Sequence, residues 1–208
     1  MDIITPTPRK PGRPLSFDRQ AALQLAMLTF WRHGYETTSI SDLTAAMGVT
    51  APSIYTAFGD KKRLFLEAMR LYAGSPDELQ HLLDQSATAR DAASAMLFSA
   101  AHAFTGDTTP RGCLLASATA SGSNASADVQ TAVANVRRDI IARLQKRIDG
   151  DIYARILPET TSAANLAAMV VAVIQGMSVL ARDGMDRESL LMMTSCALEG
   201  WPGSRIKG

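Results

Sequence analysis

The chain has 208 residues, of which 47% are hydrophobic and 20% are charged, and its formal net charge is +1. This composition is typical of a globular protein, and it excludes disordered, collagen-like and disulfide-scaffolded chains. Cys113 and Cys196 are the two cysteines, and the N-terminus has no signal-peptide pattern, so we expect free thiols and a cytoplasmic location.

The basic residues are unevenly distributed along the chain. Residues 1–74 contain nine Lys and Arg against six Asp and Glu, whereas residues 75–208 contain twelve against fourteen. The N-terminal excess of positive charge agrees with phosphate contact at that end of the protein.

Residues 1–15 are rich in proline and carry Arg9, Lys10 and Arg13. They show neither helical nor strand periodicity, so we predict a flexible basic arm. The string KPGRP is similar to the core of an AT-hook. The arm has two interpretations: a solvated tail, or a minor-groove arm if a DNA-reading unit follows it.

The first predicted helix runs from Ser16 or Asp18 to about His33. Leu23, Met27, Phe30 and Trp31 form its apolar stripe, and Gly34 ends it.

The stretch SISDLTAAMGVTAPSIYTAFGDKKR, residues 39–63, predicts two short helices joined by a tight turn. Ser39 and Asp42 fit a capping box, and Gly48 can take the positive φ that ends the first helix. Thr50 is a good N-cap for the second helix, whose inward side holds Ile54 and Phe58. The outward side then carries small polar groups and Tyr55. Such a helix suits insertion into the major groove of DNA.

Every periodic segment from residue 60 onward is helical, and no strand alternation is visible. The predicted organisation is all-α: the arm over residues 1–15, a helix-turn-helix DNA-binding domain over 16–62, and a helical effector-binding and dimerisation domain over 63–208. The expected helices of the last domain cover residues 60–73, 77–85, 88–104, 113–121, 127–149, 162–182 and 187–201.

The string ISDLTAAMGVTAPSIYTAFGDKKRLF closely resembles the DNA-binding signature of the TetR family of bacterial transcriptional regulators. The preceding FDRQAALQLAMLTFWRHGYETTS resembles the first helix of that family, so the resemblance covers residues 17–66. RGCLLASA, residues 111–118, looks like a short motif found in some branches of the family.

The resemblance implies a homodimer that places one recognition helix, residues 51–58, from each subunit in successive major grooves of a palindromic double-stranded DNA operator. It also implies a small-molecule effector that changes the spacing of the two DNA-binding units. Carried over by position, Thr38 and Thr50 would cap helices and donate to phosphate, and Lys61 would bind phosphate. The full implied DNA-binding set is Arg9, Lys10, Arg13, Thr38, Thr50, Ala51, Ser53, Tyr55, Thr56 and Lys61.

The predicted recognition helix departs from many relatives because residues 51–58 contain no Lys, Arg, Gln or Asn. Bidentate contacts to base edges are therefore unavailable from its interior. Sequence specificity would rest on methyl contacts, Tyr55, DNA shape and the basic arm.

Several residues of the predicted C-terminal domain are candidates for lining an effector pocket. Two of them have open alternatives: Cys113 is a buried core residue or a thiol that senses oxidants or electrophiles, and His102 lines the pocket or lies on the surface. The candidate set is Tyr72, Phe98, His102, Cys113, Met169, Val173 and Met177.

We expect neither a metal site nor a cofactor, because the three histidines are scattered and no ligand spacing appears. No nucleophile–base set or phosphate loop is visible, so an enzyme is disfavoured. On the helix at 127–149, Arg137, Arg138, Arg143, Lys146 and Arg147 avoid the apolar stripe, which predicts a solvated basic face.

The last two predicted helices are apolar nearly all round. Their longest apolar run, residues 166–181, is shorter than the roughly 20 residues that a membrane-spanning helix needs, so we predict a buried helix and no membrane partner. Small residues at Ala167, Ala168, Ala172 and Gly176 permit close helix approach, which fits a four-helix dimer interface. The alternative is intramolecular core.

The favoured function is therefore a dimeric, sequence-specific repressor that a small ligand releases from its operator. The alternative is a helical small-molecule or redox sensing protein whose DNA binding is vestigial.

Overall fold

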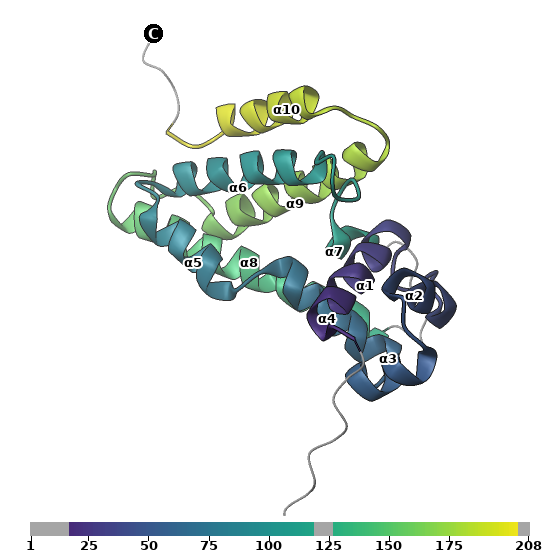
Figure 1. The fold of residues 1–208 in the computed structure, drawn as a ribbon. Helices are drawn as coiled ribbons and strands as arrows, with labels where there is room; N and C mark the ends of the chain where they lie inside the picture. Colours follow the sequence, from purple (N-terminus) through teal and green to yellow (C-terminus); the bar gives the residue numbers. More distant parts are fainter. Residues whose placement is uncertain (1–16, 119–126, 204–208) are drawn as a thin grey trace, which may run out of the picture.

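The computed structural model describes residues 17–118 and 127–203, and within these ranges the chain is helical with no strand. Figure 1 shows two regions. The head comprises α1 (Arg19–His33), α2 (Ile40–Met47), α3 (Ala51–Phe58) and the start of α4 (Lys61–Ala73). The body comprises α5 (Pro76–Gln85), α6 (Ala89–Phe104), α7 (Leu114–Ser117), α8 (Ala127–Tyr153), α9 (Ala163–Arg182) and α10 (Arg187–Glu199). The predicted all-α class is confirmed.

Each helix of the head begins at a residue whose side chain accepts a hydrogen bond from the first turn. Asp18, Ser39, Thr50 and Asp60 are the four N-caps, and Ser39 forms a complete capping box with Asp42. These caps satisfy N–H groups that have no partner within the helix. They matter most for α2 and α3, because isolated helices of eight residues are not stable in water.

The core of the head is aromatic. Phe30 of α1 packs edge-on against Phe65 of α4 with ring centroids 5.2 Å apart, and Tyr35 packs against the same Phe65 ring at 5.0 Å. Leu43 of α2 and Ile54 of α3 are fully buried in the same core. Helices α1, α2 and α3 are therefore fixed against α4, which continues toward the body.

The body is a layered helical bundle. In Figure 1, α6 and α9 lie between α10 on one side and α8 with α5 on the other, and α7 lies between this bundle and the head. The predicted helix at residues 127–149 extends to Tyr153, and the one at 187–201 ends at Glu199. Of the predicted helix at 113–121, only Leu114–Ser117 is helical, and residues 119–121 lie outside the described ranges.

On the predicted basic face of α8, the Arg147 side chain is largely buried, with 20% of its surface exposed. Arg147 forms an ion pair with Asp151, which is 2% exposed, and donates to the carbonyl oxygens of Leu83, Ser86 and Ala87. The second carboxylate oxygen of Asp151 accepts from Ala89 N–H at 2.6 Å. For Arg147 the prediction of a solvated residue was wrong, because a loop that is distant in sequence folds over it. The pair holds α8 against the α5–α6 connection.

Among the described residues, α9 alone is long and apolar enough to cross a membrane by length and composition. Core helices of soluble proteins pass the same test. Here α9 packs against α6, α8 and α10, and its small residue Ala167 is fully buried. Within the described residues α9 is therefore one of the packed helices of the bundle.

Candidate nucleic-acid interface and effector region

Helix α3 is held at the end of the head by its apolar side and by one arginine. Ile54 and Phe58 point into the core, and Gly59 ends the helix with φ 87°. The Arg19 guanidinium of α1 lies 4.4 Å from the centre of the Phe58 ring, donates to Ala57 O, and pairs with a Glu67 carboxylate oxygen at 2.6 Å. Arg19 thus ties the last turn of α3 to α1 and α4, an arrangement that the sequence analysis did not predict.

The opposite side of α3 is exposed and only mildly polar. Tyr55 is 49% exposed, Thr56 is exposed, and Ser53 is half-buried. The Thr56 hydroxyl donates to Pro52 O at 2.8 Å, and the Thr50 and Ser53 hydroxyls pair at 2.9 Å. Because these hydroxyls already have partners, the groups offered outward are mainly methyl groups and the Tyr55 ring with its hydroxyl. Thr50 is the predicted N-cap of α3, and Ala51 is the first residue of the helix.

Thr38 differs from its predicted role. It is 0% exposed, and its hydroxyl donates to Gly34 O at 2.6 Å. The N-cap of α2 is Ser39, so the prediction that Thr38 caps this helix is wrong. The buried Thr38 side chain secures the α1–α2 connection and is not available to a phosphate in this conformation.

Lys61 is held against the head. Its Nζ lies 4.6 Å from the centre of the Tyr35 ring and donates to Glu36 O at 3.3 Å. Partial burial lowers the pKa of Lys61, which the Glu36 and Asp42 carboxylates counteract. The predicted phosphate contact of Lys61 stays a prediction.

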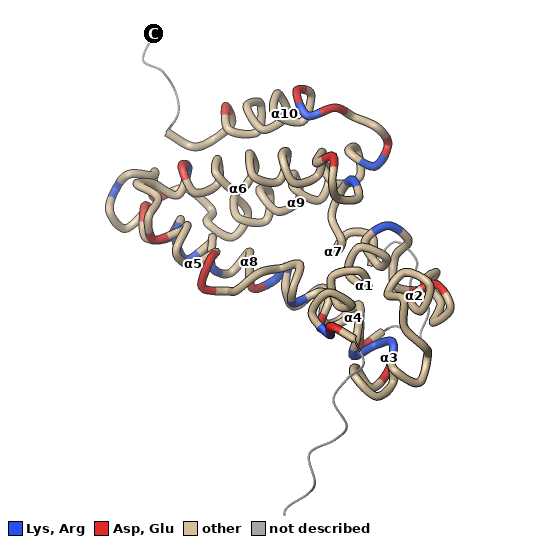
Figure 2. The backbone as a smooth tube through the Cα atoms, viewed as in Figure 1, with Lys and Arg blue, Asp and Glu red and all other residues tan. Residues whose placement is uncertain are grey.

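Two further cations follow Lys61 in the first turn of α4, and the sequence analysis did not single them out. Lys62 pairs with Asp128 at the start of α8, and the bond to this carboxylate raises the pKa of Lys62. The Arg63 side chain is exposed, with Asp60 at 3.7 Å. Figure 2 shows this blue turn beside α3. The run of three cations, KKR, was the signal available in the sequence. The arm residues Arg9, Lys10 and Arg13 lie outside the described residues.

The seven candidate effector-pocket residues do not line one cavity among the described residues. Phe98 and His102 are exposed on α6. Cys113 and Met177 are buried, whereas Tyr72 lines a shallow groove of α1 and α4, and Val173 lines a different groove. Met169 is half-buried on α9. Helical periodicity identified inward positions but could not indicate which helices face one another.

Tyr72 and Cys113 do meet, where the head contacts the body. Burial raises the pKa of the Tyr72 hydroxyl, and the adjacent Cys113 thiol, which shares a hydrogen bond with it, raises this pKa further. The Tyr72 ring packs edge-on against Trp31 with centroids 4.8 Å apart. Cys113 is therefore a buried residue in contact with an aromatic pair that belongs to α1 and α4.

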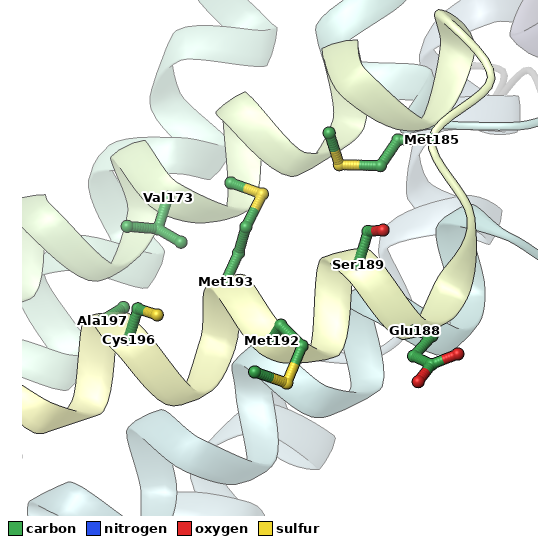
Figure 3. Close-up of a pocket in the computed structure, with 8 residues that line it drawn as sticks. All are labelled: Val173, Met185, Glu188, Ser189, Met192, Met193, Cys196 and Ala197. Atoms are coloured by element: carbon green, nitrogen blue, oxygen red, sulfur yellow. The ribbon is translucent and has the colours of Figure 1, made fainter.

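The outer side of α9 and α10 carries an apolar groove of about 620 Å³. Figure 3 shows Val173 and Met193 facing one another across the two helices, with Met185, Met192 and Cys196 along the groove and Glu188 at its edge. Met192 is 62% exposed and Val179 is 54% exposed. An exposed apolar surface of this kind on paired helices is typical of a protein–protein interface. In Figure 2 the middle of both helices is free of charged residues.

No group of three or more His, Cys, Asp or Glu side chains that could hold a metal ion occurs in residues 17–118 and 127–203.

Comparison with known proteins identifies the relatives of this chain. The family model described as "Bacterial regulatory proteins, tetR family" matches residues 22–68. The HTH-type transcriptional repressor ComR of Escherichia coli is 34% identical over 92% of both chains, and the repressor BdcR of the same organism is 27% identical over 96% of this chain and 94% of its own length.

A solved structure of a TetR family regulator is also similar to this chain. A cysteine mutant of the TetR family transcriptional regulator CifR, complexed with 26-base-pair double-strand operator DNA, is 38% identical and covers 92% of this chain and 100% of its own, with a TM-score of 0.86. The resemblance found over residues 17–66 thus extends over nearly the whole protein, and the chain belongs to the TetR family of bacterial transcriptional regulators.

Proposed function

We propose that this chain is a cytoplasmic, homodimeric transcriptional repressor that binds a palindromic double-stranded operator and leaves it when a small-molecule effector binds the body. It acts by binding alone and catalyses no reaction. The outward side of α3 carries the proposal: a capped two-turn helix at the end of the molecule that offers Tyr55, Thr56 and Ser53. The repressors ComR and BdcR and the operator complex of CifR support the same conclusion.

The proposed contacts have two roles: some position the protein on the phosphate backbone, and others read the base sequence. The exposed cations that follow α3 would neutralise phosphates, which gives affinity but little sequence information. Tyr55 and the methyl groups of Ala51 and Thr56 would contact base edges, where the thymine methyl is the natural apolar partner. Since α3 lacks forked donors, we expect the operator sequence to be read partly through DNA shape and through the arm at Arg9–Arg13.

The dimer would form through the apolar surface of α9 and α10. A two-fold axis through this surface joins the same residues of both subunits and buries the exposed Val179 and Met192. Release then follows from linkage. An effector that binds more tightly to the conformation with the wrong head spacing weakens operator binding by that difference in affinity.

The test begins with a duplex selected by the wild-type protein from a randomised pool. Tyr55→Ala should weaken binding to this duplex by about tenfold or more, because one well-placed contact to a base is worth about 1–3 kcal/mol. Tyr153→Ala is the matched control, since Tyr153 is 93% exposed on the body. Fluorescence anisotropy measures both. Equal affinities for wild type and Tyr55→Ala would show that α3 does not read the operator in this way. Failure to select any duplex would favour the alternative, a sensing protein with vestigial DNA binding.

A second candidate concerns how the repressor is released. Cys113 is buried against Tyr72 at the contact between head and body, so modification of its thiol would add atoms where the packing leaves no room. Oxidants or electrophiles would then act as effectors. N-ethylmaleimide should release the operator from wild type and from Cys196→Ser, whose replaced cysteine is exposed. Cys113→Ser should remain bound, and release of this variant would leave Cys113 as a core residue.

A further inference from the structure

We propose that Trp31, Gly112 and Arg182 form a head–body joint that sets the orientation of the DNA-binding head, although none of the three belongs to α3 or its exposed surface. The three residues come from α1, from the turn before α7 and from the last turn of α9. The inference rests on the proposed function, since head orientation matters only if two heads read one duplex. It names the positioning residues on which operator spacing depends.

Two hydrogen bonds hold Trp31 from two different parts of the body. Its Nε1 donates to Gly112 O at 3.0 Å, in a fully buried contact, and its own carbonyl oxygen accepts from the Arg182 guanidinium at 2.8 Å. The indole is 5% exposed and packs edge-on against Tyr72 of α4. Rotation of α1 relative to the body would therefore break both bonds and leave the Gly112 carbonyl group buried without a partner.

The turn at Gly112 is itself fixed on α9. A Cβ atom at this residue would lie 2.7 Å from Ser178 O and 2.8 Å from Arg182 Cγ, and Gly112 has φ 79°. The next residue donates its N–H to Ser178 Oγ at 2.7 Å. Only glycine allows this close approach in this conformation. A movement of α9 would therefore displace Gly112 and, through the hydrogen bond to Gly112 O, the indole of Trp31.

The ion pair between head and body, Lys62–Asp128, is weaker than the joint. Lys62 and Asp128 remain 45% and 76% exposed, so water and salt screen their attraction. In the joint, the bond from Trp31 Nε1 to Gly112 O is buried, and a buried hydrogen bond is costly to leave unmade. We therefore assign the control of head orientation to the joint.

The position of the joint explains how head spacing could respond to the rest of the molecule. Arg182 ends α9, the helix that also carries Val173 of the apolar groove and the exposed Val179. The same helix therefore contacts the proposed partner subunit and the base of the head. A change in how the two copies of α9 cross would rotate both heads in a symmetric dimer.

The test compares operator duplexes that differ only in half-site spacing. The probes are the duplex selected by wild type and two versions with one base pair inserted or deleted between the half-sites. The Trp31→Phe variant keeps an aromatic ring but loses the N–H donor. We expect it to reduce the preference for the selected spacing by about tenfold, the size of a typical coupling between sites. Trp201→Phe is the matched control, because its buried Nε1 has no hydrogen-bond partner among the described residues.

Arg182→Met and Arg182→Lys complete the set. Arg182→Met should behave like Trp31→Phe, and it keeps the test available if the latter fails to fold, since Arg182 is exposed. Arg182→Lys retains a donor and should restore part of the preference. If Trp31→Phe and Arg182→Met keep the wild-type spacing preference, affinity and melting temperature, the joint does not set head orientation. That result would contradict this inference but not the proposed function. A wild-type protein that binds none of the duplexes would overturn both.

Discussion

Helix α3 and the pair α9–α10 each expose one side, and the two surfaces differ in chemistry. Helix α3 has eight residues and offers one tyrosine and small polar groups. Helices α9 and α10 have 20 and 13 residues and expose valine and methionine. A surface of the first kind suits a wet, charged partner such as DNA, whereas a surface of the second kind suits a dry contact with an identical copy. The chemistry of each exposed side therefore indicates the kind of partner that would bind it.

The two regions also differ in what stabilises them. The short helices of the head depend on N-caps and on an aromatic core, because two turns of helix gain little from their own backbone bonds. The longer helices of the body gain from apolar packing along their length and from the buried Arg147–Asp151 pair.

The largest expected effect comes from placing charge on the apolar surface. The double variant Val179→Asp, Met192→Asp should be monomeric, because two like charges per subunit would face their copies across the two-fold axis. Its operator affinity should fall by about a hundredfold or more, since the second head no longer benefits from a high effective concentration. Sedimentation velocity and anisotropy measure the two quantities.

Ile156→Asp is the control for this prediction, because Ile156 is exposed on the body outside α9 and α10. It should remain dimeric and bind normally. A dimeric double variant would place the subunit interface elsewhere.

A smaller effect is expected from the capping box of α2. Hydrogen bonds from the Ser39 backbone and hydroxyl lower the pKa of Asp42 below its usual value. The carboxylate therefore stabilises the fold at pH values above its usual pKa, and this contribution is lost as the pH falls through the lowered value. Asp42→Asn should lower the melting temperature at neutral pH by about 2 °C or less.

Melting temperatures measured at low pH provide the control for the Asp42→Asn prediction. The difference in melting temperature between wild type and Asp42→Asn should shrink as the pH approaches the lowered pKa. A difference that persists unchanged at low pH would show that the charge of Asp42 does not contribute.

How far the sequence predicts this protein differs between the two regions. In the head, Ser39, Gly48 and Thr50 are local signals, and each lies at the helix boundary that it predicts. The cap role of Thr38 was wrong because it was carried over by position from the family resemblance, whereas the local pattern, Ser39 with Asp42 three residues on, indicated the N-cap that the structure has.

In the body, helical periodicity predicted which residues face inward, but it did not predict which residues they contact. Arg147 meets residues about 60 positions away, and Trp31 meets Gly112 and Arg182 at separations of 81 and 151. Such contacts are set by the way in which the helices pack, which no local pattern encodes. For the same reason Phe98 and Cys113 were both assigned to one pocket although one is exposed and the other is buried.

The most direct test of the central claim, that this chain holds its operator through phosphate and base contacts of the head, is the salt dependence of binding to the selected duplex. Each phosphate contact releases condensed counterions, so the logarithm of the affinity should fall linearly with the logarithm of the salt concentration. We predict a loss of about tenfold or more between roughly 50 and 200 mM salt. An affinity that does not change over this range would contradict the account.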